Sequence, residues 1–287
     1  MSQIKKKIVT VTPAGRSRFM KILVKYLLAN RHIIDEHRWW VNTVNKDDLE
    51  YIDSLCKQYP DFFKAVQCPA QVDPSHLIKS VKYFYATCLE PHTVYIKIDD
   101  DIVWIEDGAI EKLVKCRLEY TEPLFISANV INNAVCGHLH ERMGAYPFNI
   151  REEGAVTIYN SACQMGWQTP PFAEFVHKNF ICLLNEKSLY KFKFPLWILW
   201  EQNRFSINCI CFTGANMAEI YDKIGDNDEE DLTVTIPKIE KNYMAICGES
   251  LVSHYSFYTQ IKYLEEETDL LSQYEDLADS YLSCSTH

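Results

Sequence analysis

Apolar residues recur with two different periods along the first hundred residues of the chain. Four short runs have the β-branched and aromatic composition of buried strands: 7–12, 38–43, 62–68 and 93–98. Between these runs, apolar positions follow the 3.6-residue period of amphipathic helices, for example over residues 19–27. Alternating strands and helices predict an α/β fold with a doubly wound, mostly parallel sheet, which binds ligands beyond the carboxyl ends of its strands.

Beyond Phe125 the pattern becomes less regular, and the segment ISANVINNAVCGHLHERMGAYPFNI is rich in asparagine and histidine. This half predicts mixed sheet and long loops. The tail YLEEETDLLSQYEDLADSYL has the pattern of an acidic, solvated amphipathic helix. No repeat or low-complexity linker divides the chain, so we expect a single domain over residues 1–287 that closes with an acidic helix at 262–287.

Composition and charge limit the possible partners. The chain has 287 residues, 47% of them hydrophobic, and a formal net charge of -10, which argues against nucleic acid or an anionic membrane as partner. Its eleven cysteines are irregularly spaced and form no CxxC pair. No signal-peptide core or membrane-spanning apolar stretch is visible. We therefore expect a reduced, cytoplasmic protein whose cysteines pack as small apolar residues.

The segment YIKIDDDIVWI places Asp99, Asp100 and Asp101 directly after a strand-like run. Like charges this close oppose one another's ionisation, so the cluster needs a cation or hydrogen-bond donors. Because alternate residues of an extended segment share a face, Asp99 and Asp101 are expected to converge on Mg²⁺ or Mn²⁺. The alternative is a helix cap or an acidic turn, but IVWI at 102–105 has the pattern of a strand.

The same segment, KIDDDIVWI, together with the earlier VTPAGR, resembles the Asp-x-Asp element of GT-A-fold, metal-dependent glycosyltransferases. The segments WVNT, SANVINN, SINCICFTG and SHYSFYTQ are similar to parts of the enzymes of this family that chlorella viruses and related microbes encode. The resemblance extends from about residue 10 to residue 260. It implies a GT-A-like fold with a nucleotide-binding half at 1–105 and a half at 106–261 for the donor sugar and the acceptor.

The activity implied by this resemblance is transfer of a hexosyl or pentosyl group from a nucleotide-diphosphate sugar, a UDP-sugar, to a hydroxyl of a glycan or glycoprotein. The transfer is expected to invert the anomeric centre and to need Mn²⁺ or Mg²⁺. A viral enzyme of this kind would act in the host cytoplasm.

The resemblance also implies roles for particular residues. The nucleotide would contact the first loop, the end of the second strand and two aspartates: Thr12, Pro13, Ala14, Gly15, Arg16, Asn42, Thr43, Asp99 and Asp100. The metal ligands would be Asp99, Asp101 and His254. Substrate contacts would come from Asn129, Asn132 and Asn133.

The residue chemistry is compatible with these roles but leaves alternatives open. Gly15 permits close backbone approach, and Arg16 can bind a phosphate with two hydrogen bonds, yet Arg16 is equally compatible with an ordinary surface position. Asn42 and Thr43 can bond a base or ribose, or satisfy a turn. His254 lies in an apolar run, where a histidine is either a ligand for Mn²⁺ or part of the core.

An inverting transfer requires a carboxylate near the acceptor hydroxyl. Similar enzymes often carry acidic residues directly after the matching glycine, but here Gly214 is followed by Ala215 and Asn216. Within DNDEED, Asp228 and Glu229 are the predicted bases, and a solvated acidic loop is the alternative.

Two other functions fit parts of the sequence. The pattern YIKIDDDIV also matches the nucleophile strand of haloacid-dehalogenase-like phosphohydrolases, although that strand normally opens the domain. The third possibility is a non-catalytic protein that binds a carbohydrate or a nucleotide sugar, with an ion held by the aspartates.

Overall fold

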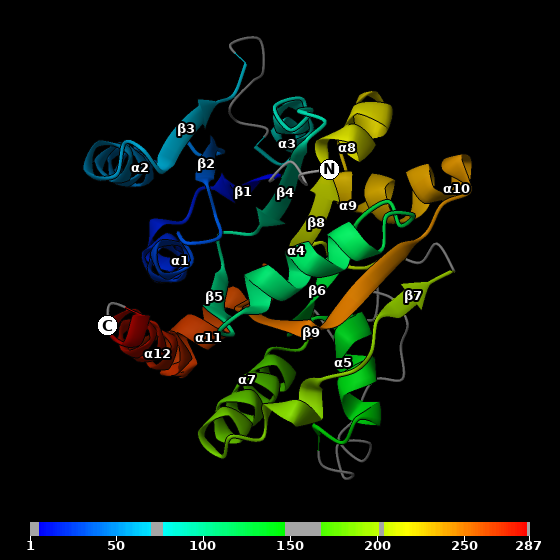
Figure 1. Cartoon of the computed structure of the whole chain (residues 1–287). Coiled ribbons are helices and arrows are strands. Elements are labelled where there is room, and N and C mark those ends of the chain that lie inside the picture. Colours follow the sequence, from blue (N-terminus) through cyan, green and yellow to red (C-terminus); the bar gives the residue numbers. More distant parts are fainter. Residues whose placement is uncertain (1–5, 70–76, 147–167, 201–203, 286–287) are drawn as a thin grey trace.

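The computed structural model describes residues 6–69, 77–146, 168–200 and 204–285 and contains one nine-stranded sheet (Figure 1). The strand order is β3-β2-β1-β4-β8-β6-β9-β5, and β7 also pairs with β9. The strands are β1 (Lys7–Ala14), β2 (Glu36–Val41), β3 (Phe63–Gln67), β4 (Thr93–Ile98), β5 (Ile102–Ile105), β6 (Ile126–Ile131), β7 (Trp197–Leu199), β8 (Cys209–Thr213) and β9 (Met244–His254).

The predicted α/β fold class is confirmed by the pairing of these strands. β1 runs parallel to both β2 and β4, and β2 runs parallel to β3, as expected for strands joined by helices. The sheet then becomes mixed, because β8 is antiparallel to β4 and to β6, whereas β6 and β9 are parallel. The predicted second half at 106–261 includes residues 147–167 and 201–203, which lie outside the described residues.

Helices cover both faces of the sheet. On one face α4 lies across β8, β6 and β9, and elsewhere α1 packs on α12 and on β5 (Figure 1). The helices are α1 (Ser17–Ala29), α2 (Lys46–Gln58), α3 (Leu77–Tyr85), α4 (Ala109–Glu119), α5 (Ala134–Arg142), α7 (Pro170–Asn185), α8 (Gly214–Ile220), α9 (Asp228–Glu230), α10 (Ile236–Glu240), α11 (Ile261–Glu267) and α12 (Leu270–Ser285). No helix in these ranges is long and apolar enough to cross a membrane.

The three aspartates form a tight turn between β4 and β5, in which the amide of Ile102 donates to the carbonyl oxygen of Asp99 at 3.1 Å. The predicted strand after the cluster is confirmed as β5. The chain turns here, so the strand alternation from which Asp99 and Asp101 were expected to share a face does not apply, and their convergence on a metal stays a prediction.

The C-terminal segment is also different from the single solvated helix that its pattern predicts. It forms two helices, because the extended backbone of Thr268 (φ -135°, ψ 162°) ends α11. α12 then buries Leu270, Tyr274 and Ala278 completely, and it packs against α1 and β5. This helix therefore belongs to the core.

A buried histidine connects α7, the end of β9 and α12. The Nε2 atom of His177 donates to the carbonyl oxygen of Tyr255 at 2.8 Å, so Nδ1 accepts from the hydroxyl of Tyr274, also at 2.8 Å. Burial lowers the pKa of His177 to about 4. The neutral imidazole is therefore the form that the fold stabilises.

We predict that this histidine makes the protein less stable in mild acid. Unfolding raises the pKa of His177 to about 6.5, so the unfolded state binds more protons as the pH falls below that value. The free energy of unfolding should be highest above pH ~6.5 and should decrease by up to about 3 kcal/mol as the pH approaches 4. Urea unfolding of His177→Gln should show a shallower pH dependence, whereas His32→Gln, at an exposed position, should behave as wild type. Equal pH dependence in all three proteins would contradict this prediction.

Replacement of each of two glycines by alanine should change the stability of the protein in opposite directions. A Cβ atom at Gly214 would lie 2.0 Å from the carbonyl oxygen of Glu90, whereas one at Gly137, within α5, would meet no atom within 4 Å. Gly214→Ala should therefore cost about 1–3 kcal/mol or more, and Gly137→Ala should stabilise by roughly 0.5–1 kcal/mol. Urea midpoints of the two variants test this, and a destabilised Gly137→Ala protein would refute the second half.

Candidate functional site

A pocket of about 430 Å³ lies at the carboxyl ends of β1, β2 and β4. β1 stands between β2 and β4, so the strand order reverses here, which is where doubly wound sheets bind ligands. The volume is in the usual range for small-molecule sites. The lining residues are Pro13, Gly15, Arg16, Asn42, Val81, Lys97, Asp99, Asp100, Ile207, Asp228 and Glu229.

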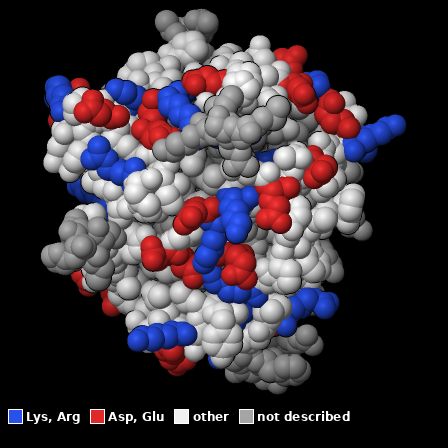
Figure 2. Space-filling model, viewed as in Figure 1, with Lys and Arg blue, Asp and Glu red and all other residues white. Residues whose placement is uncertain are grey.

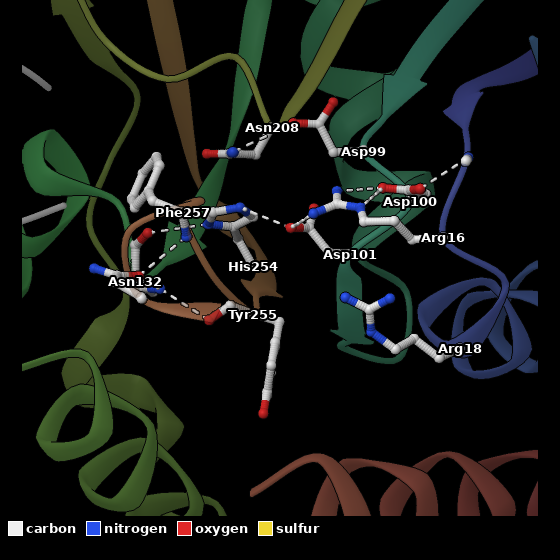
Figure 3. Close-up of polar contacts among 12 residues, drawn as sticks. Arg16, Arg18, Asp99, Asp100, Asp101, Asn132, Asn208, His254, Tyr255 and Phe257 are labelled. Atoms are coloured by element: carbon white, nitrogen blue, oxygen red, sulfur yellow. Dashed lines mark hydrogen bonds and ion pairs between the residues drawn. The ribbon is translucent and has the colours of Figure 1, made fainter. Parts of the chain in front are cut away.

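Arg16, which directly precedes α1, joins the first loop to the aspartate turn (Figure 3). Its Nε atom donates to Oδ1 of Asp100 at 3.0 Å, Nη2 donates to the same oxygen, and Nη1 lies 3.0 Å from Oδ2 of Asp101. The amide of Gly15 donates to Oδ2 of Asp100 at 3.1 Å. Arg16 is thus an ion-pair partner of two buried carboxylates rather than an ordinary surface arginine.

The two carboxylates respond differently to their surroundings. Burial raises the pKa of Asp100, and Arg16 only partly opposes that effect. Burial alone would also raise the pKa of Asp101. Arg16 and His254 together outweigh burial and hold the pKa of Asp101 below its usual range. Asp101 therefore remains the more firmly ionised of the two.

His254, the last residue of β9, lies beside Asp101. Its Nδ1 atom donates to the carbonyl oxygen of Asn132 at 3.3 Å, and its Nε2 atom lies 3.3 Å from Oδ2 of Asp101. Burial alone would lower the pKa of His254, but the Asp101 carboxylate raises it. A bond from Nδ1 to a backbone carbonyl also orients Nε2 as histidine ligands of metals are oriented.

Asp99 points away from this pair. It accepts from Nζ of Lys97 at 2.5 Å and from Nδ2 of Asn208 at 3.3 Å (Figure 3 shows the latter contact). Among the described residues, no three His, Cys, Asp or Glu side chains are grouped to hold a metal ion. Of the three predicted ligands, Asp101 and His254 are in direct contact, whereas Asp99 is hydrogen-bonded to Lys97 and Asn208 and interacts with the other two electrostatically. Their role as metal ligands stays a prediction.

The predicted bases reach the same pocket from a distant part of the chain. Asp228 accepts from the hydroxyl of Tyr85 at 3.0 Å, and Glu229 accepts from Nε of Arg204 at 2.7 Å. Burial raises the pKa of Glu229, although Arg204 opposes it. Both residues line the pocket opposite the aspartate turn, but their role as bases stays a prediction.

The three predicted substrate asparagines are buried and make internal hydrogen bonds. Asn129 donates to the carbonyl oxygens of Phe192 and Gly248. Asn132 donates to the carbonyl oxygen of Tyr255 at 3.0 Å, and Asn133 caps α5. None of the three is among the pocket-lining residues, and their assignment to substrate is not tested.

The residues predicted to contact a nucleotide divide into two groups. Pro13, Gly15, Arg16 and Asn42 line the pocket, together with Asp99 and Asp100, whereas Thr12, Ala14 and Thr43 do not. Thr12 and Ala14 are buried in β1, and the hydroxyl of Thr43 donates to Asp48 at 3.1 Å.

Gly15 is required by the fold itself. A Cβ atom at this position would lie 2.9 Å from the carbonyl oxygen of Asn42. The close approach of the loop after β1 to the end of β2 therefore needs glycine.

Sequence reasoning missed Lys97 and Tyr85. Lys97 is only 4% exposed and donates to the carbonyl oxygen of Ile207 at 3.1 Å as well as to Asp99. Burial would lower the pKa of Lys97, but Asp99, Asp228 and Glu229 raise it, so it stays charged. The sequence does contain a signal for Lys97, because it is the single charged residue inside the otherwise apolar strand TVYIKI.

Comparisons with known proteins show distant structural similarity only. No family model matches the sequence, and no curated protein matches it. The 4-diphosphocytidyl-2C-methyl-D-erythritol synthase of Anaerococcus prevotii aligns over 97% of this chain and 99% of its own, with 13% identity and a TM-score of 0.45. CMP:2-keto-3-deoxy-manno-octonic acid synthetase in complex with CTP aligns over 94% and 99%, with 8% identity and a TM-score of 0.47. Another structure of the former synthase covers 46% of this chain and 63% of its own, with 13% identity and a TM-score of 0.33.

These comparisons correct the expected activity. The three structures named here are synthases named for cytidine-nucleotide products, one of them holding CTP. Glycosyl transfer from a UDP-sugar is therefore the wrong reading. The physical reason is that an Asp-x-Asp pattern after a strand reports an acidic strand end, which does not distinguish between nucleotide-using reactions.

We predict that Arg16→Ala lowers stability by about 1–3 kcal/mol, because it leaves the buried carboxylates of Asp100 and Asp101 without their cation. Arg18→Ala is the matched control. Arg18 lies apart from the aspartates in Figure 3, and its exposed ion pair with Glu265 is worth about 0–1 kcal/mol. Urea unfolding of both variants is the measurement. An Arg16→Ala protein as stable as Arg18→Ala would show that Arg16 does not offset the cluster.

Proposed function

We propose that this chain binds a nucleoside triphosphate with a divalent cation and transfers its nucleotidyl group to an oxygen nucleophile. The acidic pocket at the strand-order reversal carries this proposal, because the structures named above are too distant to support it. The pocket is lined by four carboxylates (Asp99, Asp100, Asp228 and Glu229) and by two basic side chains, Arg16 and Lys97.

This balance of charge favours a ligand that brings its own cation. A bare triphosphate would be repelled by the excess of carboxylates, whereas a triphosphate with Mg²⁺ or Mn²⁺ presents both signs of charge. Such metals take one or two protein carboxylates and complete their shell with phosphate oxygens and water. A site with only two protein ligands is therefore compatible with the absence of a three-ligand group among the described residues.

Asp101 and His254 are the residues that fit a cation. The Oδ1 atom of Asp101 is buried and has no hydrogen-bond partner in the described structure, and its Oδ2 atom already faces Nη1 of Arg16 and Nε2 of His254. A bound cation would act as a Lewis acid and neutralise charge on the phosphates. His254 would bind it as the neutral imidazole through Nε2.

The remaining chemistry can be supplied by residues of the chain. The acceptor oxygen attacks the α-phosphorus, the bond from that phosphorus to the bridging oxygen of the β-phosphate breaks, and pyrophosphate leaves. Glu229, whose pKa is raised by burial, takes the proton when the acceptor is a hydroxyl. Lys97 and Arg16 are the cations placed to stabilise the leaving pyrophosphate.

Binding is tested first, with each of the four common nucleoside triphosphates and Mg²⁺ in a calorimeter. At least one should bind, and EDTA should abolish that binding. Arg16→Ala should raise the Kd about 10- to 100-fold, since a charge-assisted hydrogen bond is worth about 1.5–3 kcal/mol. Arg18→Ala should leave the Kd unchanged. Binding that is absent with every triphosphate, or unaffected by EDTA, would reject the proposal.

Turnover is tested with the triphosphate that binds and a broad panel of small molecules with hydroxyl or phosphate oxygens as acceptors. Pyrophosphate should be released, and Glu229→Gln should lower kcat by about 10²–10⁴-fold with little change in Kd if a hydroxyl acceptor is used. Release of inorganic phosphate without pyrophosphate would instead indicate a hydrolase.

A further inference from the structure

A second pocket, of about 270 Å³, lies between α4 and β9 and shares no lining residue with the acidic pocket. Two cysteines, Cys116 of α4 and Cys247 of β9, form part of its wall, together with Lys112, Lys115 and Leu196. Cys116 is 8% exposed and Cys247 is 6% exposed, so both are nearly buried yet border a pocket with room for molecules the size of water or peroxide.

Hydrogen bonds hold the helix over the strand at this point. The hydroxyl of Ser250 donates to the carbonyl oxygen of Ala109 at 2.9 Å, near the start of α4. One turn further along, the thiol of Cys247 lies 3.9 Å from the carbonyl oxygen of Lys112, which can accept its weak hydrogen bond. Cys116 follows on the next turn of the helix, borders the same pocket as Cys247 and interacts electrostatically with it. The two sulfur atoms are therefore held together by the packing of α4 on β9.

The two thiols are not equivalent. The interaction with Cys116, together with the amides of Glu249 and Ser250, lowers the pKa of Cys247 despite its burial. The interaction with Cys247 and burial both raise the pKa of Cys116. Cys247 is thus the thiol that ionises first, and only the thiolate is an effective nucleophile.

The surface around α4 carries side chains of both charges, so it does not select for a ligand of either charge. In the view of Figure 2, basic and acidic side chains are interspersed across the middle of the molecule, where Figure 1 places α4. A small neutral oxidant has no electrostatic barrier to overcome on such a surface.

We propose that Cys116 and Cys247 form an oxidisable thiol pair, a modification site at which a peroxide converts the two thiols into a disulfide. The Cys247 thiolate attacks one peroxide oxygen, the oxygen–oxygen bond breaks, and Cys247 becomes a sulfenic acid while the departing oxygen leaves as water after protonation. The sulfur of Cys116 then attacks the sulfenic sulfur, and the hydroxyl of the sulfenic acid leaves as a second water with the Cys116 proton. Both sulfurs are oxidised and the peroxide is reduced.

The site is independent of the proposed nucleotide chemistry, and its test needs no nucleotide. The fully reduced wild-type protein is treated with one equivalent of hydrogen peroxide under native conditions and then alkylated after unfolding in denaturant, so that buried thiols react too. Intact mass should decrease by about 2 Da before alkylation, the protein should lose two alkylatable thiols, and non-reducing digestion should yield one linked peptide pair with Cys116 and Cys247. Dithiothreitol should reverse all three changes.

Single variants separate the two roles. Cys116→Ala should leave Cys247 as a sulfenic acid that dimedone traps, whereas Cys247→Ala should give no dimedone adduct at Cys116. Cys182→Ala is the matched control, because Cys182 is an exposed cysteine on α7, and this variant should form the same linked pair as wild type.

Wild-type peptide mapping decides the outcome even if a variant fails to fold. Oxidation confined to Cys182, or a link that joins either cysteine to Cys211 instead, would overturn the proposal.

Discussion

Two buried aspartates at one turn carry negative charge that the protein must offset, and Arg16 is the side chain that offsets it. The guanidinium binds Asp100 and Asp101 together, while the amide of Gly15 holds the far oxygen of Asp100. These contacts connect the end of β1 to the turn between β4 and β5. Because an unpaired buried carboxylate is costly, the arrangement of the two central strands and the start of α1 depends on this ion pair.

The pocket keeps both signs of charge. Arg16 and Lys97 both stay protonated, because the carboxylates around them outweigh the cost of burial. A cation that binds Asp101 would compete with Arg16 for the same carboxylate and would release donors toward a phosphate. Charge compensation within the protein and charge compensation by a ligand are thus alternatives at one site.

Long-range packing brings the other chemical groups into position. Asp228 and Glu229 reach the pocket through hydrogen bonds with Tyr85 and Arg204. The thiols of Cys116 and Cys247 meet because α4 crosses β9 on the face of the sheet shown in Figure 1. In both places, groups from distant parts of the chain come together only because the sheet and its covering helices pack in this way.

The sequence by itself determined the alternation of strands and helices, the parallel pairing of the first four strands and the place of the acidic cluster at a strand end. These properties follow from local periodicity, which depends on neighbours within a few residues. Only the tertiary structure decided that Asp100 and Asp101, and not Asp99, share Arg16, and that Lys97 faces Asp228. A turn changes the direction of each side chain in a way that alternation does not describe, and the partners are up to about 130 residues apart in the chain. The interpretation of the acidic strand end as a glycosyltransferase site failed because such a pattern does not distinguish between reactions that use nucleotides. Which side chains meet was decided by strand order and turn geometry.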